Sequence, residues 1–159
     1  MTVSVPSSLK SVFNASLALG DKVVSSDALF EIEGHEEISL LIKQFPFPVL
    51  SSTGEIEVAL PNGQLSYQPQ QLKTAQQGSI TLVETVKGHI AALMTALITN
   101  GKSAKFNAKI YEGYPDNITR ILPIYNAFMV LDNPDRDFEN RGQLMMISGT
   151  IFFSYFNGQ

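Results

Sequence analysis

The stretch Glu55–Gln68, EIEVALPNGQLSYQ, alternates polar and apolar residues on both sides of an Asn-Gly pair. Alternation with period two is typical of a β-strand, and Asn-Gly readily adopts the positive φ values of a two-residue type I′ turn. The stretch therefore predicts a β-hairpin whose loop is Asn62 and Gly63. The expected cross-strand pairs are Leu60–Leu65, Ala59–Ser66, Val58–Tyr67 and Glu57–Gln68.

This register gives the hairpin one apolar face and one polar face. The apolar face is Ile56, Val58, Leu60, Leu65 and Tyr67, and the polar face is Glu55, Glu57, Ala59, Ser66 and Gln68. A solvent-facing polar side is ordinary in an antiparallel sheet, so the acidic residues need no special role to be explained. Replacing Val58 or Leu60 with Asp is expected to unfold the protein, because it would bury a charge.

Composition limits the class of protein. The chain has 159 residues, which is enough for one domain with a core but too short for two ordinary domains. Hydrophobic residues at 44% and charged residues at 16% argue against disorder and predict a largely neutral surface that is available to partners. A net charge of -4 disfavours a nucleic-acid clamp, which requires clustered cations. Cysteine is absent, so there are no disulfides or thiolate sites.

Periodicity further along the chain predicts strands, with two helices. Leu9, Val12, Phe13 and Leu17 have helical spacing after Pro6, with Ser7 or Ser8 as the cap and Gly20 at the end. A second helix is expected over about 85–99, started by Thr85 and ended by Asn100-Gly101, with Val86 on its apolar stripe. Further strands are expected over residues 29–33, 37–44, 78–84, 105–112, 118–131 and 143–156, with a bulge or sheet edge at Pro123.

These elements predict a mainly β protein with one packed helix, arranged as an antiparallel sandwich or barrel. Residues 21–28, DKVVSSDA, are small and polar like a linker. The expected organisation is therefore an N-terminal arm over 1–28 and one domain over 29–159.

Motifs for catalysis or metal binding are not apparent. The segment Leu131–Gly142 alternates acidic and amide residues, but Phe138 and Leu144 stand where a calcium loop needs Gly and Glu. His35 and His89 lie far apart without partner motifs. No catalytic residue, metal site or cofactor is expected. The first twenty residues lack the pattern of a secretory signal, so none is expected. The sequence has no run of eighteen apolar residues, so no membrane association is expected.

Several aromatic residues are candidates for subunit interfaces. In the C-terminal strand, Ile151, Phe153 and Tyr155 share the phase expected of the core, which leaves Phe152 and Phe156 on the opposite face. Phe45 and Phe47 lie in the segment FPFP, which is more aromatic than a turn requires. These four phenylalanines are the predicted interface residues.

The order of elements resembles a known family. A short helix, the strand LFEIEG (29–34), the Pro-containing turn KQFPFPVLSS (43–52), a long hairpin, a strand leading into one helix and a final strand SGTIFFSYF (148–156) are similar to the tail tube protein of contractile-tailed bacteriophages. The resemblance extends over essentially the whole chain but has no short diagnostic motif. The same fold serves the tubes of type VI secretion systems and pyocin-like particles.

The resemblance implies a structural virion protein, assembled in the host cytoplasm, whose hexameric rings stack into a tube for genome ejection. DNA would pass through the lumen without specific binding, because a negative wall repels phosphate. Sheath, baseplate or terminator proteins would be partners. The lumen-lining candidates are Glu55, Glu57, Ser66 and Gln68. The alternatives are a tube-baseplate adaptor, a secretion-system tube subunit, a monomeric β-sandwich that binds a ligand and, least favoured, an enzyme.

Overall fold

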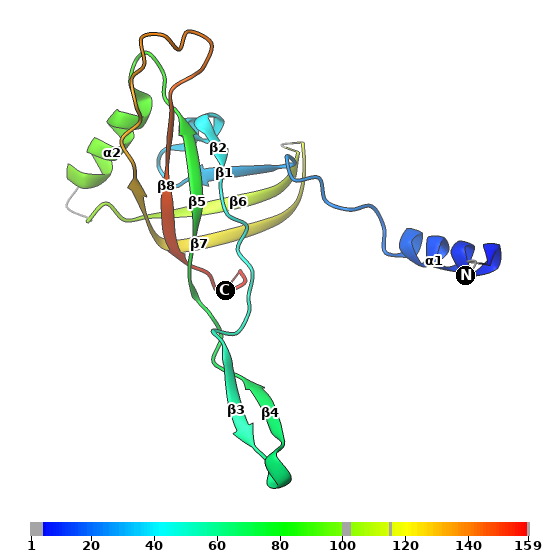
Figure 1. Ribbon diagram of the computed structural model, residues 1–159. Coiled ribbons are helices and arrows are strands. Elements are labelled where there is room, and N and C mark those ends of the chain that lie inside the picture. Colours follow the sequence, from blue (N-terminus) through cyan, green and yellow to red (C-terminus); the bar gives the residue numbers. More distant parts are fainter. Residues whose placement is uncertain (1–4, 100–102, 115, 159) are drawn as a thin grey trace.

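A curled antiparallel sheet of six strands forms the body of the protein (Figure 1). The computed structural model describes residues 5–99, 103–114 and 116–158. The strand order is β1-β6-β7-β8-β5-β2, and β3 and β4 form a separate two-stranded ribbon. The strands are β1 (Ala28–Ile32), β2 (Ile42–Gln44), β3 (Glu55–Ala59), β4 (Leu65–Pro69), β5 (Ala75–Val83), β6 (Phe106–Tyr114), β7 (Asn117–Leu131) and β8 (Met146–Ser154). The predicted fold class, mainly β and antiparallel with a packed helix, is confirmed.

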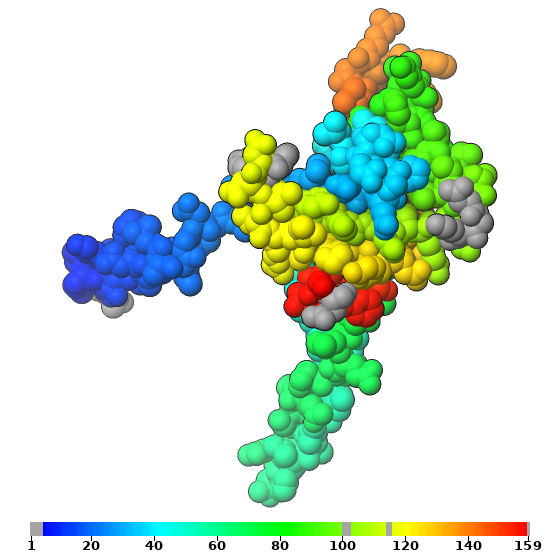
Figure 2. Space-filling view, turned by 180° about the vertical axis from the view of Figure 1, so that it is seen from behind, coloured from blue at the N-terminus to red at the C-terminus, as the bar shows by residue number. Residues whose placement is uncertain are grey.

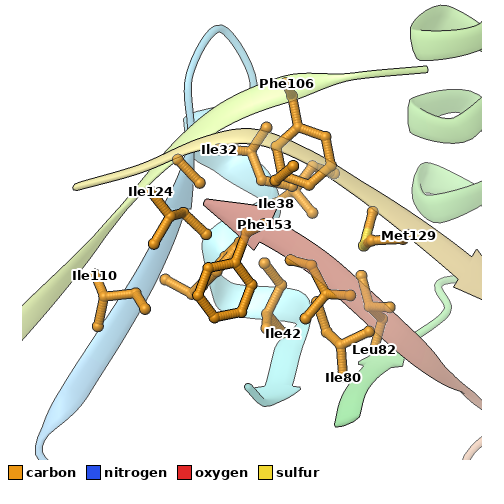
Figure 3. Packing of buried hydrophobic residues seen from close by; sticks show 14 of the residues in the cluster. Ile32, Ile38, Ile42, Ile80, Leu82, Phe106, Ile110, Ile124, Met129 and Phe153 are labelled. Atoms are coloured by element: carbon orange, nitrogen blue, oxygen red, sulfur yellow. The ribbon is translucent and has the colours of Figure 1, made fainter. Parts of the chain in front are cut away.

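The concave side of the sheet is filled by side chains that alternate along each strand, as predicted. Ile80 and Leu82 of β5 and Ile110 of β6 are fully buried (Figure 3). Ile151 of β8 is fully buried as well. The helix α2 (His89–Thr99) closes this core with Ile90, Leu93 and Leu97. Alternating burial is what allowed these strands to be predicted, because only one phase of each strand is excluded from water.

The long strand β7 curls the sheet by changing partners. Its pairs with β6 extend as far as Ala127, and its pairs with β8 begin at Tyr125 and continue to Leu131. At the change Asn126 has a φ of 54° and donates its N–H to Asn107 Oδ1 at 3.1 Å. Pro123 lies where β7 has no β8 neighbour, which confirms the predicted sheet edge, because proline cannot donate to a ladder.

The segment FPFP covers the free edge of β5. Beside Ala75–Ile80, β5 has β8 on one side and no strand on the other. Pro46 lies against Gly78 there, Pro48 is buried, and Gln76 Nε2 donates to the Val49 carbonyl at 2.8 Å. Prolines protect an edge because they offer no N–H to a further strand. The preceding Phe45 ring packs on Phe30 of β1, with centroids 5.4 Å apart.

The predicted strand over 37–44 is wrong for most of its length. Residues Glu36–Leu41 form a 3₁₀ helix, η1, and only Ile42–Gln44 are extended. The alternation of Ile38, Leu40 and Ile42 suggested a strand, yet Leu40 is 86% exposed. After Gly34, with a φ of 86°, the chain has to cross between the two edge strands, and the short 3₁₀ helix, which buries Ile38, achieves this.

The helix α2 begins four residues later than predicted. Val86 is fully exposed rather than on the apolar stripe, and the backbone turns at Gly88 before the helix starts. The first free N–H groups are capped from outside the helix: the Glu84 carboxylate accepts from Ile90 at 3.0 Å and Ala91 at 3.1 Å. The predicted C-terminal signal, Asn100-Gly101, lies outside the described residues.

The N-terminal helix α1 (Pro6–Ala18) forms where it was predicted but buries no residue against the part of the chain that the structure describes. All its residues are exposed, and it extends away from the sheet (Figures 1 and 2). Ser7 and Ser8 lie inside the helix, and its N-cap, Val5, makes no side-chain hydrogen bond, so the predicted serine cap is wrong. Gly20, with a φ of 84°, ends the helix as expected.

Candidate assembly surfaces

The ribbon that carries β3 and β4 is a continuous ladder. It runs from Ser51, which accepts from Lys73 N–H at 2.8 Å, to Leu60, which donates to the Gln64 carbonyl at 2.8 Å. The loop is therefore Pro61-Asn62-Gly63, with positive φ at Asn62 (63°) and Gly63 (74°). The predicted two-residue loop, and with it the predicted register, is wrong by one residue.

The observed register mixes the two predicted faces. Ala59 lies opposite Leu65, Val58 opposite Ser66, Glu57 opposite Tyr67, and Ile56 opposite Gln68. Side chains that lie opposite each other project to the same side. One side, called the acidic face below, carries Glu55, Glu57, Leu65 and Tyr67; the other, called the neutral face, carries Ile56, Val58, Ser66 and Gln68. The four lumen-lining candidates are thus divided between opposite faces.

Burial could not select the register of this hairpin. Every residue of β3, of β4 and of the loop between them is exposed, and the ribbon projects away from the sheet (Figure 1). A shift by one residue exchanges faces, which matters only where one face is buried. Here the three-residue loop determines the pairing.

Both faces of the ribbon retain unburied apolar side chains. On the neutral face Ile56 is 43% exposed, and on the acidic face Tyr67 is 68% exposed. A lone two-stranded hairpin is at best marginally stable in water. An ordered ribbon with an apolar strip on each face is therefore typical of an element stabilised by other chains.

The four predicted interface phenylalanines divide into two kinds. Phe152 is half-buried and stacks on Phe128, with centroids 5.0 Å apart, and Phe45 packs on Phe30. Phe47 is 50% exposed and Phe156 is 44% exposed. The structure uses Phe45 and Phe152 within the chain and leaves Phe47 and Phe156 on the surface. Their role at an interface stays a prediction.

A groove lies between the arm, the end of β2 and the β6–β7 pair. It has a volume of about 520 Å³. Its apolar lining comes from Val23, Val24, Ala28, Phe45 and Phe47, and its charged lining from Lys43, Arg120 and Glu112. Arg120 and Glu112 lie directly opposite each other in the β6–β7 ladder. Sequence reasoning missed this groove because its wall combines three segments far apart in the chain, and none of them carries a local motif.

The described part of the chain contains no cluster of side chains that could bind a metal ion. Within it, no three His, Asp or Glu side chains are close enough to hold an ion. His89 is exposed and interacts with Thr85 Oγ1, one turn before it. In the described residues, no helix has the length and hydropathy needed to cross a membrane.

Comparison with known proteins gives a structural likeness and no sequence match. No model of a known protein family matches the chain, and no curated protein matches its sequence.

Three similar solved structures are components of contractile injection systems. One belongs to the PVC sheath-tube complex of an extracellular contractile injection system in the extended state; at 15% identity it has a TM-score of 0.59, covering 88% of this chain and 93% of its own. Another is the tube-terminating cap of the anti-feeding prophage, with 15% identity and a TM-score of 0.58; the match covers 85% of this chain and 89% of the cap chain. A third is the PVC sheath/tube terminator in the extended state, with 14% identity and a TM-score of 0.58; the match covers 86% of this chain and 95% of the terminator chain.

Each comparison covers at least 85% of this chain and at least 89% of the other chain. At this identity the likeness establishes the fold. The chain has the fold of contractile injection system tube and terminator proteins.

Proposed function

We propose that this protein is a structural subunit that assembles with copies of itself into the tube of a contractile particle. The observation that carries the proposal is the likeness over 88% of the chain to a component of a sheath-tube complex. The exposed ribbon and the exposed helix α1 support it, because both present apolar side chains that no other described residue of the chain covers. The proposal assigns the chain no catalytic activity.

The finer form of the proposal is a phage tail tube of stacked hexameric rings around a channel for DNA. Sheath protein and baseplate or terminator proteins would be its partners, and residues 1–28 would be the arm that joins subunits. The observed register limits the lumen prediction: Glu55 and Glu57 lie on one face of the ribbon and Ser66 and Gln68 on the other, so at most one pair can face a channel.

A terminator is the second candidate, because two of the similar structures described above are a tube-terminating cap and a sheath/tube terminator. Electron microscopy of the purified full-length protein at increasing concentration separates the candidates. A tube subunit is expected to form stacks of growing length, whereas a terminator is expected to stop at a single ring. A protein that stays monomeric at every concentration would contradict both.

A further inference from the structure

We propose that the acidic face of the β3–β4 ribbon docks into the groove beside Lys43 and Arg120 on a second copy of this chain. The inference rests on the proposed self-assembly and assigns the surfaces that meet. The two surfaces match in kind: an apolar strip beside two carboxylates on the ribbon, and apolar side chains beside two cations in the groove.

The ribbon side of this contact has a defined order. Glu55 and Glu57 follow one strand, and Leu65 and Tyr67 follow the other, on the same face. Leu65 and Tyr67 are each more than half exposed, so much of their apolar surface is available to a partner. Aromatic side chains such as Tyr67 are frequent at the centres of protein interfaces.

The groove side offers the complementary chemistry. Phe47, 50% exposed, and Val24, 58% exposed, provide apolar surface. Lys43 and Arg120 outnumber the one carboxylate of the lining, Glu112. Lys43 Nζ donates weakly to Met146 Sδ at 3.6 Å, outside the groove lining, so this exposed side chain has to turn toward the groove to meet an occupant. Apolar surface with excess positive charge favours an occupant that is apolar and negative.

The other unpartnered element of the chain fits this groove less well. Helix α1 also exposes apolar side chains, among them Val12 and Phe13, but its only charged residue is Lys10. Docking α1 beside Lys43 and Arg120 would bring a third cation near them, with Glu112 as the one carboxylate of the lining. The carboxylates of the ribbon supply what α1 lacks.

The occupant has to come from another copy. The ribbon extends away from the body of its own chain, and all residues of β3 and β4 are exposed, so its own groove does not hold it (Figure 2). A contact in which one surface patch meets a different patch on the next copy generates a ring or a stack rather than a closed dimer. Such head-to-tail docking is the geometry that a tube requires.

Charge reversal in both surfaces tests the contact. The ribbon variant is Glu55→Lys/Glu57→Lys, and the groove variant is Lys43→Glu/Arg120→Glu, both in the full-length chain. Either variant alone is expected to weaken self-association roughly tenfold or more in apparent Kd, measured by sedimentation velocity, because like charges then meet at the interface. Mixing the two variants is expected to restore association, because each ribbon then meets a groove of opposite charge.

A matched control places the same charges on the other side of the ribbon. Ser66→Lys/Gln68→Lys lies on the neutral face, so the groove variant is not expected to rescue any defect that this control causes. Circular dichroism checks that each variant keeps its β-sheet signal, and Glu55→Gln/Glu57→Gln is the milder substitute if a reversal disturbs folding.

The results separate this inference from the proposed function. Wild-type association that the ribbon variant weakens but the mixture does not restore would overturn the docking site and leave self-assembly standing. Association unaffected by the groove variant, or equal rescue of the neutral-face control, would overturn it as well. Wild-type protein that fails to associate would contradict the proposed function itself.

Discussion

Glu57 lies directly opposite Tyr67 in the ladder of β3 and β4, so a carboxylate and an aromatic ring share one face of an exposed ribbon. The register that produces this pair places apolar side chains on both faces of the ribbon, rather than all of them on one face. The ribbon is therefore suited to contacts with other chains rather than to packing on its own sheet.

Charges placed on the ribbon should leave the fold intact. Val58 and Leu60 are 37% and 42% exposed, so Val58→Asp or Leu60→Asp is expected to change the free energy of unfolding by no more than about 0.5 kcal/mol, as surface substitutions usually do. This reverses the expectation from sequence, which assumed a buried face. Thermal unfolding followed by circular dichroism measures it, and Ile80→Asp, at a fully buried position, is the control expected to unfold the protein. Loss of the folded state in the Val58 variant would contradict the observed exposure.

The Glu84 carboxylate should stabilise the protein in a pH-dependent way. Burial raises the pKa of this carboxyl, but hydrogen bonds from the N–H groups of Ile90, Thr85 and Ala91, together with the nearby His89, outweigh that effect and hold the pKa below its usual value. The contribution is therefore complete above the unfolded-state pKa, near 4.3, and is lost as the pH falls through the lower folded-state value.

Glu84→Gln is accordingly expected to cost about 1 kcal/mol at neutral pH, the usual cost of losing a helix cap. Urea unfolding at pH 7 and at progressively lower pH measures the difference between the two proteins. The difference should shrink with acid, because the native carboxyl then also becomes neutral. A difference that is constant with pH would show that Glu84 does not act through its charge.

The close contact between Gly78 and Pro46 should make an added methyl group costly. A Cβ at position 78 would lie 2.8 Å from Pro46 Cγ and nearer still to Cβ of the same ring. Gly78→Ala is expected to cost about 1–3 kcal/mol, the range for overpacking. Gly142→Ala is the matched control, because no atom lies within 4 Å of its added Cβ. Equal stability of the two variants in urea unfolding would mean that FPFP does not lie on the β5 edge.

Removing the N-terminal helix should separate folding from assembly. Helix α1 has no buried residue, so deletion of residues 1–19 is expected to leave Tm within a few degrees of the full chain. Its exposed apolar residues should matter to contacts between copies, so the truncated protein is expected to associate more weakly in sedimentation velocity. A large fall in Tm would contradict the exposure of α1, and unchanged association would remove the arm from the assembly.

The predictability of each element from sequence follows from how its side chains are buried. Strands such as β5 and β8 were predictable because Ile80, Leu82, Ile151 and Phe153 recur on one buried face. The hairpin register was not, because neither face is buried and Pro61 extends the loop. The start of α2 was missed because its cap, Glu84, acts across a turn that only the fold creates. The groove combines residues from distant segments, so no local pattern pointed to it.

The most direct test of self-assembly is negative-stain electron microscopy of the purified full-length protein at high concentration, with light scattering on the same sample. Hollow rings, alone or stacked into tubes, are the expected result. A homogeneous population with the mass of a single 17.4 kDa chain would contradict the proposal.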